Sequence, residues 1–330
     1  MKKGNTIRIG VIGVGHLGNF HVKQLKEISG ISISGIYDNN PIRADEISGQ
    51  YDVKSFSSLE KLLRISDAVS IVTPTPYHFE IANLALDKDC HLFIEKPITD
   101  NIEHAGLLLN KAEKLNKIIQ VGHIERFNPA FTVLKNLHIQ PLFIEAHRLA
   151  EFNPRGNDVP VILDLMIHDL DIILSLVASE IRDIRANGVK VVSSSVDIAN
   201  ARIEFENGCI ANVTASRISQ KIMRKMRLFQ NEEYITIDFQ NRVLEEYKIC
   251  TNPPKSNETE KVVELGGPEQ RYVLYRKPHV PKQDALKEEL THFTNSITNV
   301  QKPEADGESA AKALALALEI QKIIGNQFHL

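Results

Sequence analysis

The sequence predicts an α/β protein of two domains, in which a parallel sheet layered with helices precedes an α+β domain with a large, mostly antiparallel sheet. Residues 1–125 alternate short apolar runs with amphipathic stretches, which is typical of βαβ units around a parallel sheet. Beyond residue 125, long strand-like segments follow one another with few helices between them. A chain of 330 residues is long enough for two hydrophobic cores.

The first domain, residues 1–125, contains five apolar runs that we predict to be strands, at residues 7–12, 31–37, 68–73, 91–95 and 117–122. Amphipathic stretches between them predict helices at residues 17–28, 58–64, 78–87 and 102–115. In the first of these helices, one face is expected to carry Leu17, Val22, Leu25 and Ile28.

The second domain, residues 126–305, opens with one apolar helix at residues 161–177. Strands are then predicted at residues 182–192, 199–205, 209–217, 226–229, 234–239 and 243–249. Asn207-Gly208 predicts a hairpin turn, because both residues tolerate the positive φ that such turns require. A last segment, residues 306–330, contains an Ala- and Leu-rich helix at 307–324 that we expect to pack back on the first domain.

Composition excludes several classes of protein. The chain is 42% hydrophobic and 25% charged, as in ordinary globular domains, and a net charge of −3 argues against nucleic acid or an anionic membrane as partner. The cysteines are too few and too far apart for a disulfide framework or a zinc site (Cys90, Cys209 and Cys250). No apolar run approaches the roughly 18 residues that span a membrane, so we expect a cytoplasmic protein.

A glycine-rich turn, Gly13-Val14-Gly15-His16-Leu17-Gly18, follows the first strand and opens the first helix. Gly13 would allow the tight turn, Gly15 would let the backbone approach a pyrophosphate, and Gly18 would let helix and strand pack closely. The backbone N–H groups at the start of the helix, including His16 and Leu17, would bind the anion. A glycine turn without a ligand is the alternative, but the flanking strand and helix favour a Rossmann-type dinucleotide site.

The second predicted strand ends beside Asp38. A carboxylate at this position can accept hydrogen bonds from the ribose hydroxyls of the adenosine and would repel a 2′-phosphate. NAD is therefore predicted rather than NADP. Arg43 leaves the alternative open, because a nearby arginine can accommodate that phosphate.

Glu95-Lys96-Pro97 ends the fourth predicted strand. Ligands of an open parallel sheet bind at the carboxyl ends of its strands, and Pro97 stops the ladder because it has no N–H. Lys96 is then placed to hydrogen-bond a reacting oxygen, and Glu95 to contact the cofactor. A lysine with a solvated head group is the alternative, since lysines are mostly exposed.

The third strand ends in a similar way, with Thr73-Pro74-Thr75-Pro76-Tyr77-His78. Its prolines predict a rigid loop near the nicotinamide ribose, in which Thr73, Pro74 and His78 contact the cofactor. His78 could instead be only the first turn of the next helix.

The apolar helix of the second domain carries three polar residues at steps of four and three, Asp164, His168 and Asp171. This spacing places them on one helical face, and burying unpaired charge is unfavourable, so the face should meet partners or a cleft. A histidine beside carboxylates can act as base or acid near neutral pH. The alternatives are a solvated helix edge, a satisfied core histidine, or a metal site, for which a third ligand is lacking.

In their order along the chain, the glycine turn, Glu95-Lys96-Pro97 and Asp164 with His168 resemble the Gfo/Idh/MocA oxidoreductases. The resemblance implies a Rossmann domain followed by a domain with an open antiparallel sheet that forms subunit contacts, and hence a homodimer or homotetramer. It also implies that Lys96 and His168 act at the reacting carbon with Asp164 in support. Many members have Asn in place of Thr75, which leaves the local contact open.

Two further segments, Gly122 to Pro129 and Asp164 to Asp171, resemble the members that oxidise the 3-hydroxyl of UDP-N-acetylglucosamine or its uronate. Such enzymes work beside an aminotransferase, towards 3-amino sugars of lipid A or surface glycans. The resemblance implies a nucleotide-sugar substrate, whose diphosphate needs cationic groups. The candidate substrate-binding residues, beside Lys96, Asp164 and His168, are Arg126, Asn128, Arg155, Arg217, Lys221 and Arg224. The basic run around Arg217 could equally be a solvated face.

Three other functions compete with oxidation of a nucleotide sugar. The first is the same chemistry on a free polyol or sugar, such as inositol or glucose. The second is a catalytically silent NAD-binding regulator, and the third is NAD-dependent glycoside hydrolysis. His168 is favoured as the base over Lys96, although the two could share this role.

Overall fold

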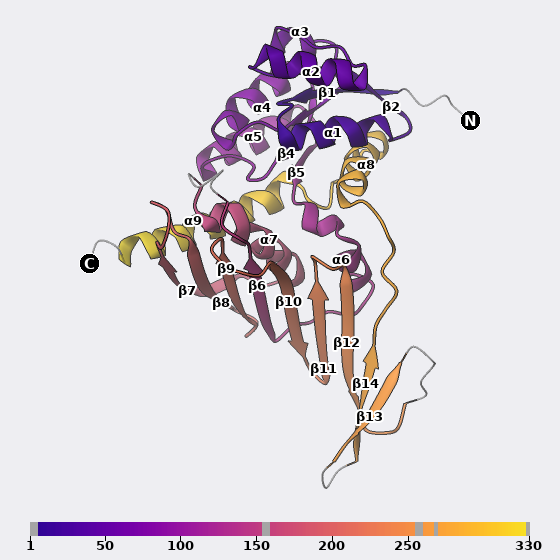
Figure 1. The fold of residues 1–330 in the computed structure, drawn as a ribbon, viewed down its shortest axis with the longest axis vertical. Helices are drawn as coiled ribbons and strands as arrows, with labels where there is room; N and C mark the ends of the chain where they lie inside the picture. Colours follow the sequence, from indigo (N-terminus) through magenta and orange to yellow (C-terminus); the bar gives the residue numbers. More distant parts are fainter. Residues whose placement is uncertain (1–5, 154–158, 255–259, 267–269, 328–330) are drawn as a thin grey trace. The chain divides into compact units, whose positions relative to one another are not determined.

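The computed structural model describes residues 6–153, 159–254, 260–266 and 270–327. It divides the chain into two compact units, one of Met1–Phe127 with Asp284–Leu314 and the other of Asn128–Gln283 with Ala315–Leu330 (Figure 1). In the part of the chain that is described, no helix is both long and apolar enough to cross a membrane.

The first unit is built on a parallel five-stranded sheet in the order β2-β1-β3-β4-β5. Its strands are β1 Ile7–Ile12, β2 Ile31–Tyr37, β3 Ala68–Ile71, β4 His91–Glu95 and β5 Ile119–Gly122, so all five predicted strands are confirmed. The strand order reverses between β1 and β3, and ligands of such sheets bind in the crevice at this point, outside the carboxyl ends of the strands.

Helices connect these strands: α1 His16–Lys26, α2 Pro41–Tyr51, α3 Leu59–Leu63, α4 His78–Asp87 and α5 Ile102–Lys114. Helix α2 was not predicted. Its start nevertheless carries a local signal, because the Asn40 side chain accepts hydrogen bonds from the N–H groups of Ile42 and Arg43, and Pro41 takes the first helical position. In α1 the prediction was wrong for Leu17, which is 44% exposed, whereas His21 is fully buried.

Helix α8, Ala285–Asn299, belongs to the first unit. Leu286, Leu290 and Phe293 join the core formed by β1, β2, β4 and α1, and the Phe293 ring lies 5.8 Å from that of Phe93. The division of the chain therefore differs from the expected one, in which residues up to 305 stayed in the second domain. The physical reason is that the chain returns after the second sheet to bury one amphipathic helix.

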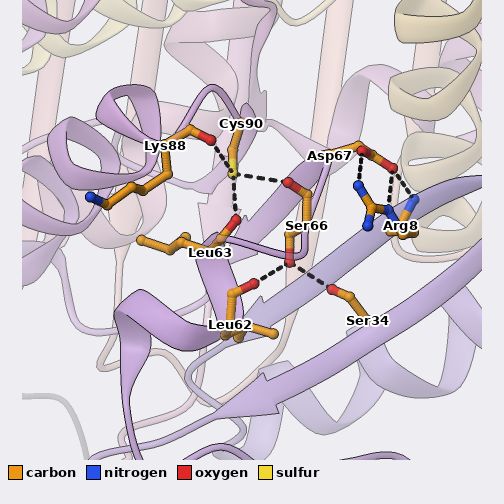
Figure 2. Close-up of polar contacts among 8 residues, drawn as sticks. All are labelled: Arg8, Ser34, Leu62, Leu63, Ser66, Asp67, Lys88 and Cys90. Carbon is orange, nitrogen blue, oxygen red and sulfur yellow. Dashed lines mark hydrogen bonds and ion pairs between the residues drawn. The ribbon is translucent and has the colours of Figure 1, made fainter.

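Polar contacts tie together the amino ends of β1, β3 and β4 (Figure 2). The guanidinium of Arg8 makes two hydrogen bonds to Asp67, of 2.7 and 3.0 Å, and its backbone N–H makes a third. Cys90 points its thiol towards the Ser66 carbonyl, 3.4 Å away. Burial raises the pKa of Cys90 to about 11, so this cysteine stays a neutral thiol and serves packing.

The second unit contains a nine-stranded sheet in the order β13-β14-β12-β11-β10-β6-β9-β8-β7, and the prediction of a mostly antiparallel sheet is confirmed. Neighbouring strands pair antiparallel except for β6 and β9, which are parallel. The predicted strands correspond to β7 Ile181–Val189, β8 Ile198–Phe205, β9 Ile210–Ser216, β10 Met223–Gln230, β11 Glu233–Asp238 and β12 Val243–Cys250. Gly208 has a φ of 85°, in the left-handed region, which confirms the predicted turn between β8 and β9.

Three strands of this sheet were not predicted: β6 Phe143–Leu149, β13 Lys261–Leu265 and β14 Arg271–Arg276. The predicted helix at 161–177 is a π-helical turn, Ile162–Met166, continued by α7 Ile167–Leu176. The short helix α6, Pro129–Leu134, packs with α7 against the sheet. The last helix, α9 Gly307–Gln327, begins in the first unit and ends in the second.

Candidate functional site

The glycine turn has the backbone that a bound pyrophosphate needs. Gly13 has a φ of 83°, and a Cβ there would lie 2.6 Å from the carbonyl oxygen of Val72. A Cβ on Gly18 would lie 2.0 Å from the Gly13 oxygen, so neither position accepts a side chain. Gly15 differs, because a Cβ there would meet nothing within 4 Å. The open space over Gly15, at the amino end of α1, fits an anionic group of a dinucleotide.

A pocket of about 720 Å³ lies over this turn and brings most of the predicted cofactor contacts together. The predicted residues in its lining are Gly13, Gly15, His16, Leu17, Asp38, Thr73, Pro74, Glu95 and Lys96. Other lining residues, which sequence reasoning did not select, are Tyr37, Asn39, Leu59, Val72, Tyr77 and Ile81. Gly18 and His78, both described, lie outside this lining.

Asp38 follows the end of β2 and is held beside the glycine turn. Its carboxylate accepts hydrogen bonds from the N–H of Val14 at 2.8 Å and of Asn40 at 2.9 Å. The side chain of Arg43 is bound nearby, because its Nε donates to the Val14 carbonyl at 2.9 Å and its Nη1 to Glu46 at 3.0 Å. Asp38 lines the pocket, whereas the Arg43 guanidinium already makes hydrogen bonds to Val14 and Glu46.

Glu95 and Lys96 reach the pocket from the carboxyl end of β4. One oxygen of Glu95 is 3.0 Å from Nε2 of His21, and the other accepts the backbone N–H of Lys96 at 3.3 Å. His21 was missed by sequence reasoning. Its signal was a polar residue on the apolar face of α1, one helical turn after Gly18.

His78 lies behind the loop that follows β3. It is 1% exposed, and its Nδ1 and Nε2 lie 2.9 and 2.8 Å from the carbonyl oxygens of Pro97 and Thr73. Burial is the largest influence on this imidazole and lowers its pKa, although the two backbone contacts act in the opposite direction. His78 therefore links the backbone of Thr73, at the start of the loop after β3, to the backbone of Pro97, which follows Lys96.

The polar residues of α7 and of the π-helical turn before it differ in burial. Asp164, in the π-turn, and His168, in α7, are half-buried, whereas Asp171 is buried. The next residue after His168, Asp169, forms a buried bidentate pair with Arg148 of β6, with two contacts of 2.9 Å, and sequence reasoning missed this pair.

Among the described residues no group of three His, Cys, Asp or Glu could hold a metal ion.

Two of the predicted substrate-binding residues make hydrogen bonds to backbone groups of the protein. Arg126, in the first unit, is 9% exposed and donates to the carbonyl of Glu304 at 2.8 Å. Asn128, in the second unit, caps α6 by accepting from the N–H of Ala130, and it donates to the carbonyl of Phe239.

The remaining basic candidates differ in exposure. Arg217 follows β9 and is 5% exposed; one guanidinium nitrogen bonds the Val159 carbonyl, and within the described residues its Nε and Nη1 have no hydrogen-bond partner. Lys221 and Arg224 are exposed on and before β10. Arg155 lies outside the described residues.

Comparison with protein families assigns both parts of the chain. Residues 7–123 match the model of an oxidoreductase family with an NAD-binding Rossmann fold, named GFO_IDH_MocA. Residues 145–232 match the C-terminal domain of the same family. The chain belongs to the Gfo/Idh/MocA oxidoreductases. The resemblance drawn from the glycine turn, Glu95-Lys96-Pro97 and Asp164 with His168 is thereby confirmed.

Relatives with known activities are similar to this chain over nearly their whole length. The UDP-N-acetylglucosamine 3-dehydrogenase of Acidithiobacillus ferrooxidans is 38% identical over 318 residues, which are 96% of each chain. A solved structure of that enzyme superposes with a TM-score of 0.87 at 37% identity, covering 96% of this chain and 97% of the other. The myo-inositol 2-dehydrogenase of Thermotoga maritima is 24% identical over 96% of each chain.

Proposed function

We propose that this oxidoreductase converts the 3-hydroxyl of UDP-N-acetylglucosamine, or of its uronate, to a ketone with NAD. The 38% identity across 96% of both chains to a UDP-N-acetylglucosamine 3-dehydrogenase carries the proposal. The pocket supports it, because the glycine turn, Asp38 and Lys96 line one cavity. The cofactor would lie over Gly15, with the ribose at Asp38 and the reactive end towards Lys96.

The residues on this chain supply the proton chemistry in the proposal. NAD, held by the glycine turn and Asp38, would supply the hydride acceptor for the sugar carbon. His168 removes the hydroxyl proton, Asp164 orients the imidazole, and Lys96 hydrogen-bonds the same oxygen and stabilises the charge that develops there. His168 is the base in this scheme, and Lys96 is the residue that could share the role.

NAD rather than NADP is part of the proposal. The carboxylate of Asp38 would repel a 2′-phosphate, and it is held in place by two backbone N–H groups. Arg43, which could have bound that phosphate, is engaged by Val14 and Glu46. Both observations favour the cofactor without the phosphate.

A nucleotide-sugar diphosphate would meet cationic groups of the second unit. Arg217 supports this part of the proposal, since a buried guanidinium with unpaired N–H groups is unfavourable until an anion joins it. The exposed side chains of Lys221 and Arg224 follow on the same segment. A free polyol would have no use for these charges.

The proposal includes a homodimer or homotetramer that forms through the open face of the large sheet. Five aromatic rings form a ladder across adjacent strands, with centroid distances of 4.8–5.6 Å, through Phe143, Phe229, Tyr234, Tyr247 and Tyr275. Phe239 stacks on Phe131 of α6, and Tyr234 alternates with the residues that share its face. The half-buried ladder therefore faces away from α6, where a second copy of the sheet can cover it.

The chemistry also requires a partner reaction. A 3-keto sugar is an unfavourable product, so we propose that an aminotransferase consumes it and yields a 3-amino sugar for lipid A or a surface glycan. The proposal places the enzyme in the cytoplasm, where NAD and nucleotide sugars are available to both enzymes.

The test is NADH formation from NAD and UDP-N-acetylglucosamine, with glutamate and a 3-keto-sugar aminotransferase present to remove the product. The uronate and inositol are assayed in parallel. Turnover of the parent sugar or of the uronate supports the proposal and distinguishes the two substrates. NADH from inositol alone would contradict it.

Oxidation of a free polyol is the second candidate, because the family also contains the inositol dehydrogenase that is 24% identical to this chain. Affinity for UDP distinguishes the two functions, since a polyol dehydrogenase has no reason to bind a nucleoside diphosphate. Binding of NAD and UDP without turnover of any sugar would favour the regulatory alternative.

A further inference from the structure

His21 is a buried histidine behind the candidate lysine, and the proposed chemistry has not used it. Its side chain is fully buried in α1, the helix that starts at the glycine turn. The ring packs edge-on against Phe93, with centroids 5.4 Å apart. A polar ring in such surroundings is tolerated only when its nitrogens are hydrogen-bonded.

Both ring nitrogens of His21 have partners. Nδ1 lies 2.9 Å from the hydroxyl of Ser70 on β3, and Nε2 lies 3.0 Å from Oε1 of Glu95. An ionised carboxylate can only accept, so Nε2 carries the hydrogen in this pair. The Ser70 hydroxyl can donate or accept, so it satisfies Nδ1 whether the imidazole is neutral or charged.

Glu95 connects this histidine to the pocket. Its second carboxylate oxygen accepts the N–H of Lys96 at 3.3 Å. The carboxylate also fills the space beside Gly122, where a Cβ would lie 2.7 Å from Oε2. Contacts with His21 of α1, with the backbone N–H of Lys96 and with Gly122 of β5 thus hold this carboxylate in a single orientation. Glu95 and Lys96 both line the pocket.

We propose that His21 is a positioning residue, which fixes the Glu95 carboxylate and, through it, the backbone and the electrostatic surroundings of Lys96. This inference rests on the proposed function, in which Lys96 contacts the reacting oxygen. A fixed carboxylate keeps both the position of the lysine and the charge beside it constant during the reaction. Small errors in the position of a catalytic group reduce turnover strongly without weakening binding.

The kinetic test compares His21→Leu with His21→Gln. The leucine removes the hydrogen bond to Glu95, and we expect kcat to fall by about tenfold or more, while KM for the sugar and Kd for NAD change by less than about threefold. The glutamine can offer an amide N–H in place of Nε2, so it should retain most of the activity. The matched control is His104→Leu, because His104 is a more exposed histidine of the same unit and bonds Asp100 and Asn101.

A double-mutant cycle separates positioning from a merely structural role. If His21 acts through Glu95, the double variant H21L/E95Q has the same kcat as E95Q alone, because the coupled pair is already broken. Losses that simply add would overturn the proposal. If H21L does not fold, His21→Asn, which is too short to reach Glu95, takes its place against H21Q.

A third measurement does not depend on turnover. This measurement is the rate at which an amine-reactive reagent modifies Lys96, determined by peptide mass spectrometry over a range of pH. The rate should change to the same extent in H21L and E95Q and stay unchanged in H104L. If the wild-type protein oxidises none of the sugars, the proposed function fails, and this measurement still decides the role of His21. Equal modification profiles in wild type and H21L would show that His21 does not act on Lys96.

Discussion

At the scale of single residues, the candidate site depends on side chains held by neighbours that sequence patterns do not mark. Asp38 is fixed by two backbone N–H groups, and Glu95 is fixed by His21. The motifs identify the groups that are proposed to touch ligands, whereas residues such as His21, which orient them, come from other elements. Substitutions at both kinds of position therefore have distinct, testable effects.

The proposed chemistry predicts that Lys96→Ala and His168→Ala each lower kcat by about a hundredfold or more, because each removes a group that acts on the reacting oxygen. Kd for NAD, measured by titration of protein fluorescence, should stay within about threefold of the wild-type value. Unchanged turnover in either variant would remove that residue from the mechanism.

Cofactor choice gives a second prediction at this scale. Glu46→Ala removes the partner of Arg43 Nη1, which lies 3.0 Å away, and leaves the guanidinium available to a 2′-phosphate. We expect kcat/KM for NADP relative to NAD to rise by up to about tenfold, which corresponds to about 1.4 kcal/mol. The matched control is Glu60→Ala, which removes the exposed partner of Arg64. An unchanged ratio in E46A would show that Glu46 does not influence cofactor choice.

At the scale of elements, two segments differ from what the sequence predicted. The helix predicted at 161–177 begins as a π-turn that contains Asp164, and π-turns inside helices are frequent at functional sites. Helix α8 follows the second unit in the sequence but completes the core of the first. The place of α8 follows from the packing of its apolar face against the first core rather than from its position in the chain.

The packing of α8 predicts that Phe293→Ala destabilises the first unit by about 3–5 kcal/mol, because a fully buried ring is replaced by a cavity. The measurement is the urea midpoint of the transition that NAD binding shifts upwards. Glu288→Ala, on the exposed side of the same helix, should change it little. A midpoint for F293A equal to that of E288A would contradict the assignment of α8 to this core.

The loop between β7 and β8 is organised by Asp197, which is fully buried. Burial raises the pKa of this carboxyl, but hydrogen bonds from the Ser193 hydroxyl and from the N–H groups of Ser193, Val192 and Val191 outweigh it, so the pKa is lowered. A lowered pKa in the folded state adds stability above the unfolded pKa, near 4, and this contribution is lost as the pH falls below that value.

Asp197→Asn is therefore expected to lower the stability of the second unit by about 1–3 kcal/mol at pH 7. The difference from the wild-type protein should shrink as the pH falls below about 4. Thermal unfolding measured between pH 7 and pH 3 checks the sign. A difference that stays constant over this range would show that ionisation of Asp197 does not contribute.

At the scale of the whole molecule, the chain passes from the first unit to the second near residue 127, returns at Asp284, and leaves the first unit again inside α9. The first unit carries the cofactor pocket, and the second carries Asp164, His168 and the open sheet. The half-buried aromatic ladder is the part of that sheet that the proposed assembly would cover.

This arrangement predicts that Tyr247→Glu weakens self-association. Tyr247 lies inside the ladder, 5.2 Å from Tyr234 and 5.0 Å from Tyr275, and loss of a tyrosine that anchors an interface costs about 2 kcal/mol or more. Light scattering coupled to size exclusion, over a dilution series, measures the effect. Lys248→Glu, the adjacent exposed position on the other face of β12, is the control. If both variants keep the mass of the wild-type protein, the ladder is not the interface.

The sequence alone determined the parallel sheet, the glycine turn, the end of β4 just before Lys96 and the antiparallel character of the second sheet, because each depends on a local pattern of apolar, glycine and proline residues. It did not reveal β6, whose partners β9 and β10 are distant in the chain, or β13 and β14, or the return of α8 to the first core. It also missed His21 behind Glu95 and the bidentate pair of Arg148 and Asp169. Only the tertiary structure decided these contacts, because burial and hydrogen bonding between distant segments have no periodic signature in the sequence.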